Sequence, residues 1–184
     1  MRADAVRNRA RLVEIADELF AARGHGVSTE TIAKAAGVGV GTVFRHFPTK
    51  EALLREVYVT RLERLVDRAE TLMAHREPGE AFFAFITEAV DWAAAKNATA
   101  EALVAAGVDV ADVAVDVAPD LRRAFRDLLA GAKRVGAVRP DLEPAALSAL
   151  LVGLARAAEH AKDDPIALAA VLDVFRDGMR PHPA

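Results

Sequence analysis

A long apolar stripe with the period of an α-helix constrains the fold more than any other feature of this chain. Its members follow one another at steps of four or three residues: Leu54, Tyr58, Leu62, Leu65, Ala69 and Leu72. This spacing places their side chains on one face of a helix, which we expect to begin after a Thr49 cap and to end at about His75. The same period recurs along the chain and strand patterns are nearly absent, so the sequence predicts an all-α fold of about nine helices.

Caps and breakers divide the N-terminal sequence into three shorter helices. We expect a first helix at about residues 5–23, which Gly24 ends, because apolar residues recur there at helical spacing. The Ser28 hydroxyl should cap a second helix of two turns that closes at Gly37. A third helix should follow and end before Pro48, since a proline disfavours helical geometry in the residue before it.

The later helices show the same signals. Pro78 and Gly79 should break the chain, and helical spacing resumes over residues 82–92 and 121–129. Two final helices should follow Pro144 and Pro165. Valines are frequent at 108–118, but aspartates recur there at steps of three and four, so we predict a helix or helical turn that Pro119 ends. Its aspartates should form a solvated acidic face rather than a cation site. They are Asp109, Asp112 and Asp116.

The composition suits a cytoplasmic protein that does not enter a membrane. Of the 184 residues, 53% are hydrophobic, and there is no cysteine to form a disulfide or a thiolate metal site. The longest apolar run, 147–155, is much shorter than the roughly 20 residues that span a bilayer. Residues 1–50 carry a net charge of +3, although the whole chain carries −3. This asymmetry suggests a small basic module joined to a larger acidic one.

The segment TIAKAAGVGVGTVFRHF contains three glycines, which could in principle hold a nucleotide phosphate. A dinucleotide loop follows a strand, however, and a P-loop ends in Gly-Lys-Ser/Thr, whereas Gly37, Gly39 and Gly41 follow a helix and precede Thr-Val-Phe. A helix-turn-helix fits this context better. In it Ala33 lets two helices approach closely, Gly37 adopts the left-handed conformation of the turn, and Val43 fills the space between the helices.

Residues 10–58, and above all TIAKAAGVGVGTVFRHFPTKEALL, resemble the DNA-binding domain of the TetR family of one-component transcriptional regulators. The resemblance implies an N-terminal helix-turn-helix DNA-binding domain over 1–50, with the motif itself at about 28–47. A linking helix at about 50–75 would join it to a C-terminal ligand-binding and dimerisation domain over 51–184. It further implies a homodimer that places two third helices in the major groove of a palindromic operator. A small-molecule effector, substantially apolar, would release this repressor from the DNA.

The expected DNA contacts cluster around the third helix. Lys50 lies in the first turn of the next helix, where its ammonium and the helix dipole favour a phosphate. His46 matches the phosphate-facing histidine of the family, and Arg45 can reach a guanine edge, a phosphate or only solvent. Thr42 and Thr49 can bind phosphates or act as caps. The complete expected set is Ser28, Thr29, Gly39, Val40, Gly41, Thr42, Phe44, Arg45, His46, Thr49 and Lys50.

Two positions depart from the family pattern. Phe44 stands where tyrosine is common, so a phosphate contact through that hydroxyl is lost, although the ring can meet a thymine methyl or pack. Gly39 and Val40 stand where many members carry a polar pair. We therefore expect specificity from Arg45, Thr42 and Val40, together with DNA shape read through close backbone approach at Gly39 and Gly41.

The C-terminal sequence predicts less. Residues 138–158 resemble the start of the family's penultimate helix, so the last two helices are expected to form a four-helix dimer interface with Gly153 at a close crossing, unless their leucines fill the chain's own core. The expected interface residues are Leu147, Leu151, Leu154, Ala158, Leu168, Leu172 and Phe175. Those expected to line an apolar ligand pocket, or to be plain core, are Phe82, Phe85, Ile86, Trp92, Leu103, Phe125 and His160.

Catalytic chemistry has little support in this sequence. Its serines, Ser28 and Ser148, lie outside any G-x-S-x-G context, and no paired-histidine metal motif is present. We expect no catalytic residue, no metal site and no cofactor. Two alternatives to a regulator stay open: a helical ligand-binding or scaffold protein whose helix-turn-helix is vestigial, and a small all-α enzyme.

Overall fold

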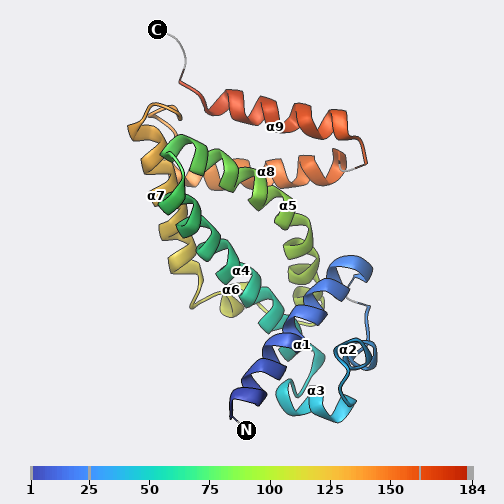
Figure 1. Ribbon diagram of the computed structural model, residues 1–184. Coiled ribbons are helices and arrows are strands. Elements are labelled where there is room, and N and C mark those ends of the chain that lie inside the picture. Colours follow the sequence, from blue (N-terminus) through green and yellow to red (C-terminus); the bar gives the residue numbers. More distant parts are fainter. Residues whose placement is uncertain (1, 25, 162, 182–184) are drawn as a thin grey trace. The chain divides into compact units, whose positions relative to one another are not determined.

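The computed structural model describes residues 2–24, 26–161 and 163–181, and these residues form α-helices without a β-strand (Figure 1). This confirms the all-α prediction. The helices are α1 (Arg2–Arg23), α2 (Thr29–Ala36), α3 (Val40–His46), α4 (Lys50–His75), α5 (Pro78–Ala105), α6 (Val110–Val113), α7 (Ala118–Arg134), α8 (Pro144–Ala161) and α9 (Pro165–Met179). None of the described helices is both long enough and apolar enough to cross a membrane.

Four prolines lie at the starts of helices. Pro78, Pro144 and Pro165 are the first residues of their helices, where the missing N–H costs no hydrogen bond. The prediction that Pro119 ends a helix is wrong, since Pro119 is the second residue of α7. The segment before it is a four-residue helix, α6, followed by turns. Asp109 caps α6 by accepting a hydrogen bond from the Ala111 amide at 2.8 Å.

The contacts divide the chain into two compact units, each made of two segments. The N-terminal unit comprises Met1–Leu62 and Ala95–Val117, and the C-terminal unit comprises Glu63–Ala94 and Ala118–Ala184. Helices α4 and α5 each contribute residues to both units. This division differs from the expected single boundary near residue 50, which stays a prediction.

The apolar stripe of α4 supplies core residues to both units. Leu54, Tyr58 and Leu62 are buried in the N-terminal unit, and Leu65, Ala69 and Leu72 are buried in the C-terminal unit. This confirms the stripe. Burial of one large apolar side chain contributes about 1.5–3 kcal/mol, so α4 anchors each core.

A buried arginine joins three helices of the N-terminal unit. Arg61 of α4 forms an ion pair with Asp17 of α1 and donates a hydrogen bond to the Thr99 hydroxyl of α5 at 2.8 Å. The Arg61 side chain is only 9% exposed and the Asp17 side chain 18%, so water does little to screen their charges. Arg61 also donates a hydrogen bond to the backbone carbonyl of Asp17 at 3.4 Å. Spacing alone does not reveal this site, because Arg61 directly precedes an apolar stripe residue and looks like an exposed helix charge.

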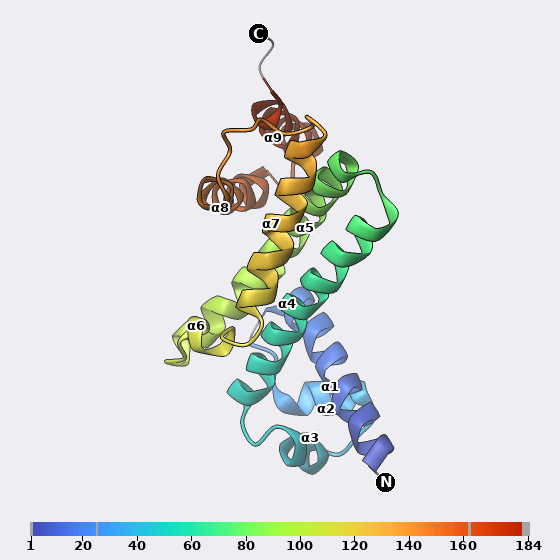
Figure 2. The same cartoon turned by 90° about the vertical axis from the view of Figure 1, so that its left-hand side faces the viewer.

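The C-terminal unit contains an aromatic contact and a half-buried ion pair. Phe85 of α5 and Phe125 of α7 meet edge to face with ring centroids 5.0 Å apart. Arg68 of α4 binds Glu88 of α5 through two hydrogen bonds of 2.5 and 2.7 Å. This pairing holds the pKa of Glu88 below its usual value. Helices α8 and α9 run antiparallel and side by side in both views (Figures 1 and 2).

Replacing Asp17 by alanine should leave the Arg61 charge buried without its main partner. We expect Asp17→Ala to lower the free energy of unfolding by about 3 kcal/mol, measured by urea denaturation. Asp4→Ala is the matched control on α1, because Asp4 pairs with Arg7 at the surface, where both side chains are more than 60% exposed. An Asp17→Ala protein as stable as the Asp4→Ala protein would contradict a structural role for this pair.

Candidate nucleic-acid interface

The turn between α2 and α3 is built by caps at both ends of α2. The Ser28 hydroxyl accepts a hydrogen bond from the Thr31 amide at 3.2 Å, which confirms Ser28 as the N-cap. Gly37 follows α2 in the left-handed conformation, with φ 68° and ψ 31°. The Val38 amide then donates to the Ala33 carbonyl at 3.0 Å, which closes the helix end. Gly37 therefore has the conformation that the sequence predicts, and it redirects the chain into α3.

Helix α3 packs through one buried valine and the residue that ends the helix. Ala33 is 1% exposed and Val43 is fully buried, as the sequence predicts. Phe47 is also buried, and its ring lies beneath the guanidinium of Arg9 at 4.9 Å from the ring centroid. Arg9 forms an ion pair with Glu56 of α4. The hydrogen bond that Arg9 donates within this pair lowers the pKa of Glu56. Helices α1 and α4 thus hold the end of α3 in place.

The opposite face of α3 is open and carries most of the expected DNA contacts. Phe44 is 43% exposed, which is unusual for a phenylalanine, and Arg45 is exposed beside it. Thr42 and His46 are half-buried on the same helix, as is Val40 at its start. The exposed phenylalanine ring and the arginine give this face both apolar and cationic contacts.

Gly39 and Gly41 lie at the exposed start of α3. Both are exposed, both have negative φ, and a Cβ placed at either would meet no atom within 4 Å. Packing within the described protein therefore does not demand a glycine at these two positions. The missing side chains leave the backbone at the start of α3 open to close approach by a ligand.

The start of α4 is partly occupied by the protein's own side chains. The Thr49 hydroxyl accepts a hydrogen bond from the Ala52 amide at 3.1 Å, so Thr49 caps α4 as the sequence predicts. The Glu51 carboxylate accepts a hydrogen bond from its own amide and another from the Thr49 hydroxyl, and both lower the pKa of Glu51. Glu51 was not among the residues expected at this site. A phosphate at this helix end would depend on the half-buried Lys50 and would compete with the Glu51 carboxylate.

Ser28 and Thr29 lie at the start of α2. Ser28 is exposed and Thr29 is half-buried. Because the Ser28 hydroxyl already accepts the Thr31 amide, it can contact a phosphate only through its remaining hydrogen-bonding capacity. The Glu30 carboxylate binds its own amide and the Ser28 hydroxyl, and these hydrogen bonds lower the pKa of Glu30. At the start of α2, as at the start of α4, a glutamate carboxylate accepts a hydrogen bond from a backbone amide of the first turn.

The residues expected to line a ligand pocket lie in different surroundings. Phe82, Phe85 and Ile86 are buried in the C-terminal unit, and Leu103 is buried in the N-terminal unit. Trp92 and Phe125 are half-buried, and His160 is exposed. The ligand role of this set stays a prediction.

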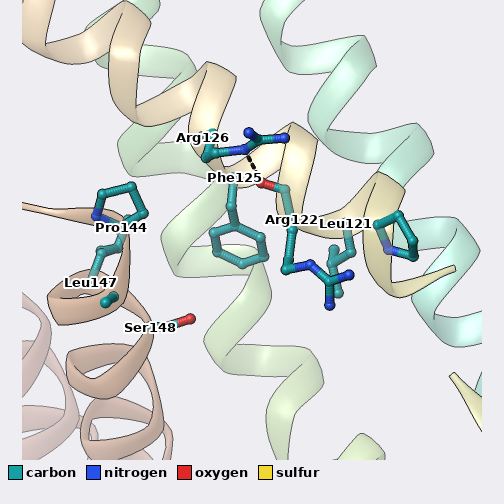
Figure 3. Close-up of a pocket in the computed structure, with 9 residues that line it drawn as sticks. Leu121, Arg122, Phe125, Arg126, Pro144, Leu147 and Ser148 are labelled. Carbon is teal, nitrogen blue, oxygen red and sulfur yellow. Dashed lines mark hydrogen bonds between the residues drawn. The ribbon is translucent and has the colours of Figure 1, made fainter. Parts of the chain in front are cut away.

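A cleft of about 600 Å³ lies between α7 and α8 of the C-terminal unit (Figure 3). Of the seven expected pocket residues, Phe125 lines it. The other lining residues were not expected, because a loop separates the two helices that supply them and periodicity does not predict the course of a loop. They are Pro119, Leu121, Arg122, Arg126, Pro144, Ala145, Leu147 and Ser148.

The expected interface residues of α8 and α9 are partly covered within the chain. Leu147, Leu154 and Ala158 are buried, whereas Leu151, Leu168, Leu172 and Phe175 are half-buried. Other apolar side chains of the two helices are exposed: Leu150 by 44%, Val152 by 67%, Ile166 by 84% and Val174 by 74%. The most regular leucine stripe of α8 thus faces the unit's own core, and the apolar surface lies beside it.

The fold and the turn define a helix-turn-helix DNA-binding protein, and comparison with known proteins agrees. Residues 12–57 match the family of bacterial regulatory proteins of the TetR type. Residues 77–181 match the C-terminal domain of SbtR-like transcriptional regulators. The chain belongs to the TetR family of transcriptional regulators and carries its DNA-binding helix-turn-helix domain.

Some similar proteins match nearly the whole chain, and others match a short part of it. A TetR transcription regulatory protein from Mycobacterium vanbaalenii is 44% identical, with 97% of this chain and 98% of that chain covered and a TM-score of 0.81. The TetR regulator SCO0520 from Streptomyces coelicolor is 31% identical, with 95% and 99% covered and a TM-score of 0.77. An HTH-type transcriptional regulator from Staphylococcus aureus (strain bovine RF122 / ET3-1) is 48% identical over 54 residues, which span 29% of each chain.

Substituting Gly37 should disturb the turn through the backbone alone, because a Cβ there would meet no atom within 4 Å. We expect Gly37→Ala to lower the free energy of unfolding by about 1 kcal/mol, and Gly37→Val by more, in urea denaturation. Gly41→Ala is the control, since its Cβ is equally unhindered but its φ is negative within α3. Alanine favours a helix, so the control should be neutral or slightly stabilising. Equal effects at the two glycines would contradict this role for Gly37.

Proposed function

We propose that this protein is a repressor that binds a palindromic operator as a homodimer in the cytoplasm and is released by a small-molecule effector. Each protomer inserts α3 into a major groove, with Arg45 and Phe44 facing base edges. Lys50 binds a phosphate next to the groove and sets the register of the helix. The effector binds in the C-terminal unit and changes the affinity of the dimer for DNA.

The observation that carries this proposal is the open face of α3. An exposed phenylalanine and an exposed arginine lie beside two glycines that internal packing does not require. An apolar ring can contact a thymine methyl, a guanidinium can bind a guanine edge, and a bare backbone can approach the sugar-phosphate chain. These features together suit a duplex groove. Because Gly39 and Val40 at the start of α3 have no side-chain hydrogen-bond donor, shape and deformability of the operator supply part of the specificity.

The homodimer is supported by the outer surface of α8 and α9. A groove of about 520 Å³ between them is lined by apolar residues and by Gly153 and Gly178, at which a Cβ would meet no atom within 4 Å. Leu150 and Val174 line the groove and are exposed in the single chain. Burying such apolar side chains against a second copy is favourable, and the glycines allow helices to cross closely.

DNA binding can be tested by separating phosphate contact from base recognition. We expect Lys50→Ala to weaken binding to all sequences about equally and to reduce the salt slope of log K by about one unit. Arg45→Ala, if Arg45 binds a guanine, should instead relax the preference at one base pair by about 1–3 kcal/mol. The measurement is fluorescence anisotropy at several salt concentrations, with a duplex selected from a random DNA pool.

The matched control is Arg123→Ala, which removes one exposed positive charge from α7. It should leave the affinity and the salt slope unchanged. If Lys50→Ala behaves like this control, Lys50 does not bind phosphate. If no duplex is selected and binding is insensitive to salt, a helical scaffold or ligand-binding protein replaces the repressor.

A charge in the α8–α9 groove should oppose association of two chains. We expect Val174→Glu to raise the dissociation constant of the dimer about a hundredfold, because association would bury an unpaired carboxylate. Sedimentation velocity at micromolar concentration should then detect monomers, and operator binding should weaken. Val104→Glu, at an equally helical and exposed valine of α5, is the control and should stay dimeric. A Val174→Glu protein that stays dimeric would place the interface elsewhere.

A further inference from the structure

The cleft between α7 and α8 combines an apolar wall with two positive charges. Leu121, Arg122, Phe125 and Arg126 line it from α7, and Pro144, Leu147 and Ser148 line it from α8 (Figure 3). No carboxylate is among the residues that line it in the described chain. This is notable in a part of the protein that is acidic overall, since residues 51–184 carry a net charge of −6.

The two arginines of the cleft repel each other along the helix. Arg122 and Arg126 are four residues apart, so they share one face of α7, and like charges at this spacing destabilise a helix. The Arg126 Nε donates a hydrogen bond to the Arg122 carbonyl at 3.4 Å, which ties this side chain to the preceding turn of α7 (Figure 3). Neither guanidinium forms an ion pair within the residues that the structure describes.

The neighbouring Arg123 shows what an ordinary surface arginine of α7 does. Its guanidinium pairs with Asp120, one turn earlier, at 2.9 Å. At three and four residues from Arg122 and Arg126, by contrast, the helix offers no acidic residue. The two cleft arginines therefore have no acidic partner on α7, whereas Arg123 has one.

The remaining lining fits the apolar body of a small molecule. The half-buried Phe125 ring packs on the buried Phe85. The buried Leu147 lines the cleft from α8. The volume of about 600 Å³ is within the range of small-molecule sites, which bury an apolar body and orient it by a few polar groups. The Ser148 hydroxyl is a further donor at this site.

We propose that this cleft binds an amphipathic organic anion, with its carboxylate or similar group on Arg122 and Arg126 and its apolar body against Phe125 and Leu147. Guanidinium groups bind carboxylates through charge-assisted hydrogen bonds, which are stronger than neutral ones. An anion here also relieves the repulsion between the two arginines. The inference deepens the proposed function by naming the chemical class of the effector, and it rests on that function only for the effect on DNA.

The test compares two ligands that share a ten-carbon tail, sodium decanoate and 1-decanol, by displacement of the neutral dye N-phenyl-1-naphthylamine from the intact protein. Decanoate should bind about tenfold more tightly than 1-decanol. In the double variant Arg122→Gln, Arg126→Gln the affinity for decanoate should fall about tenfold, while the affinity for 1-decanol stays within about twofold. Both arginines are exposed, so the double variant should fold normally.

Arg123→Gln is the matched control, since it removes the same charge from the same helix outside the cleft. It should bind both ligands as the unchanged protein does. The proposal is overturned if decanoate does not bind, if the double variant keeps its affinity, or if Arg123→Gln loses as much. These measurements contain no DNA, so they test anion binding in the cleft alone. The anisotropy experiment tests operator binding separately.

Discussion

Burial of one apolar face along the whole of α4 is the constraint from which the two cores follow. Its first half supplies Leu54 and Tyr58 to the N-terminal unit, and its second half supplies Leu65 and Leu72 to the C-terminal unit. Within the first of these cores Arg61 projects from the same helix and meets Asp17 and Thr99. A buried charge is tolerated only where partners of fixed geometry meet it, so α1 and α5 have to be in register with α4.

The helix-turn-helix has a packed inner face and an exposed outer face. Gly37 sets the turn by its left-handed conformation, Val43 fills the space beneath α3, and Arg9 covers Phe47 where α3 ends. The outward face keeps Phe44 and Arg45 exposed beside glycines. Such a division suits a DNA-binding site, because base contacts require a helix held in one orientation and an unobstructed surface. The carboxylate of Glu51 at the start of α4 adds competition that a phosphate has to overcome.

Local signals predicted the helices well and the sites less completely. The Ser28 and Thr49 caps, the Gly37 turn and the buried Ala33 and Val43 depend on neighbours a few residues away, so spacing alone identifies them. Pro119 was misjudged because a proline can end one helix or begin the next, and only the path of the chain distinguishes the two. The leucines of α8 presented a similar ambiguity, since periodicity finds an apolar face but does not say whether the same chain or another covers it.

The sequence by itself determined the class of fold, the helix-turn-helix and the regulator family, because these depend on short-range spacing and on a specific local motif. Only the tertiary structure decided that Arg61 meets Asp17 and Thr99, which are 44 and 38 residues away. It likewise brought α7 and α8 together so that Arg122, Arg126 and Ser148 line one cleft. Contacts of this kind depend on how helices pack after they form, and no local propensity encodes which exposed-looking arginine becomes buried and which one lines a cleft.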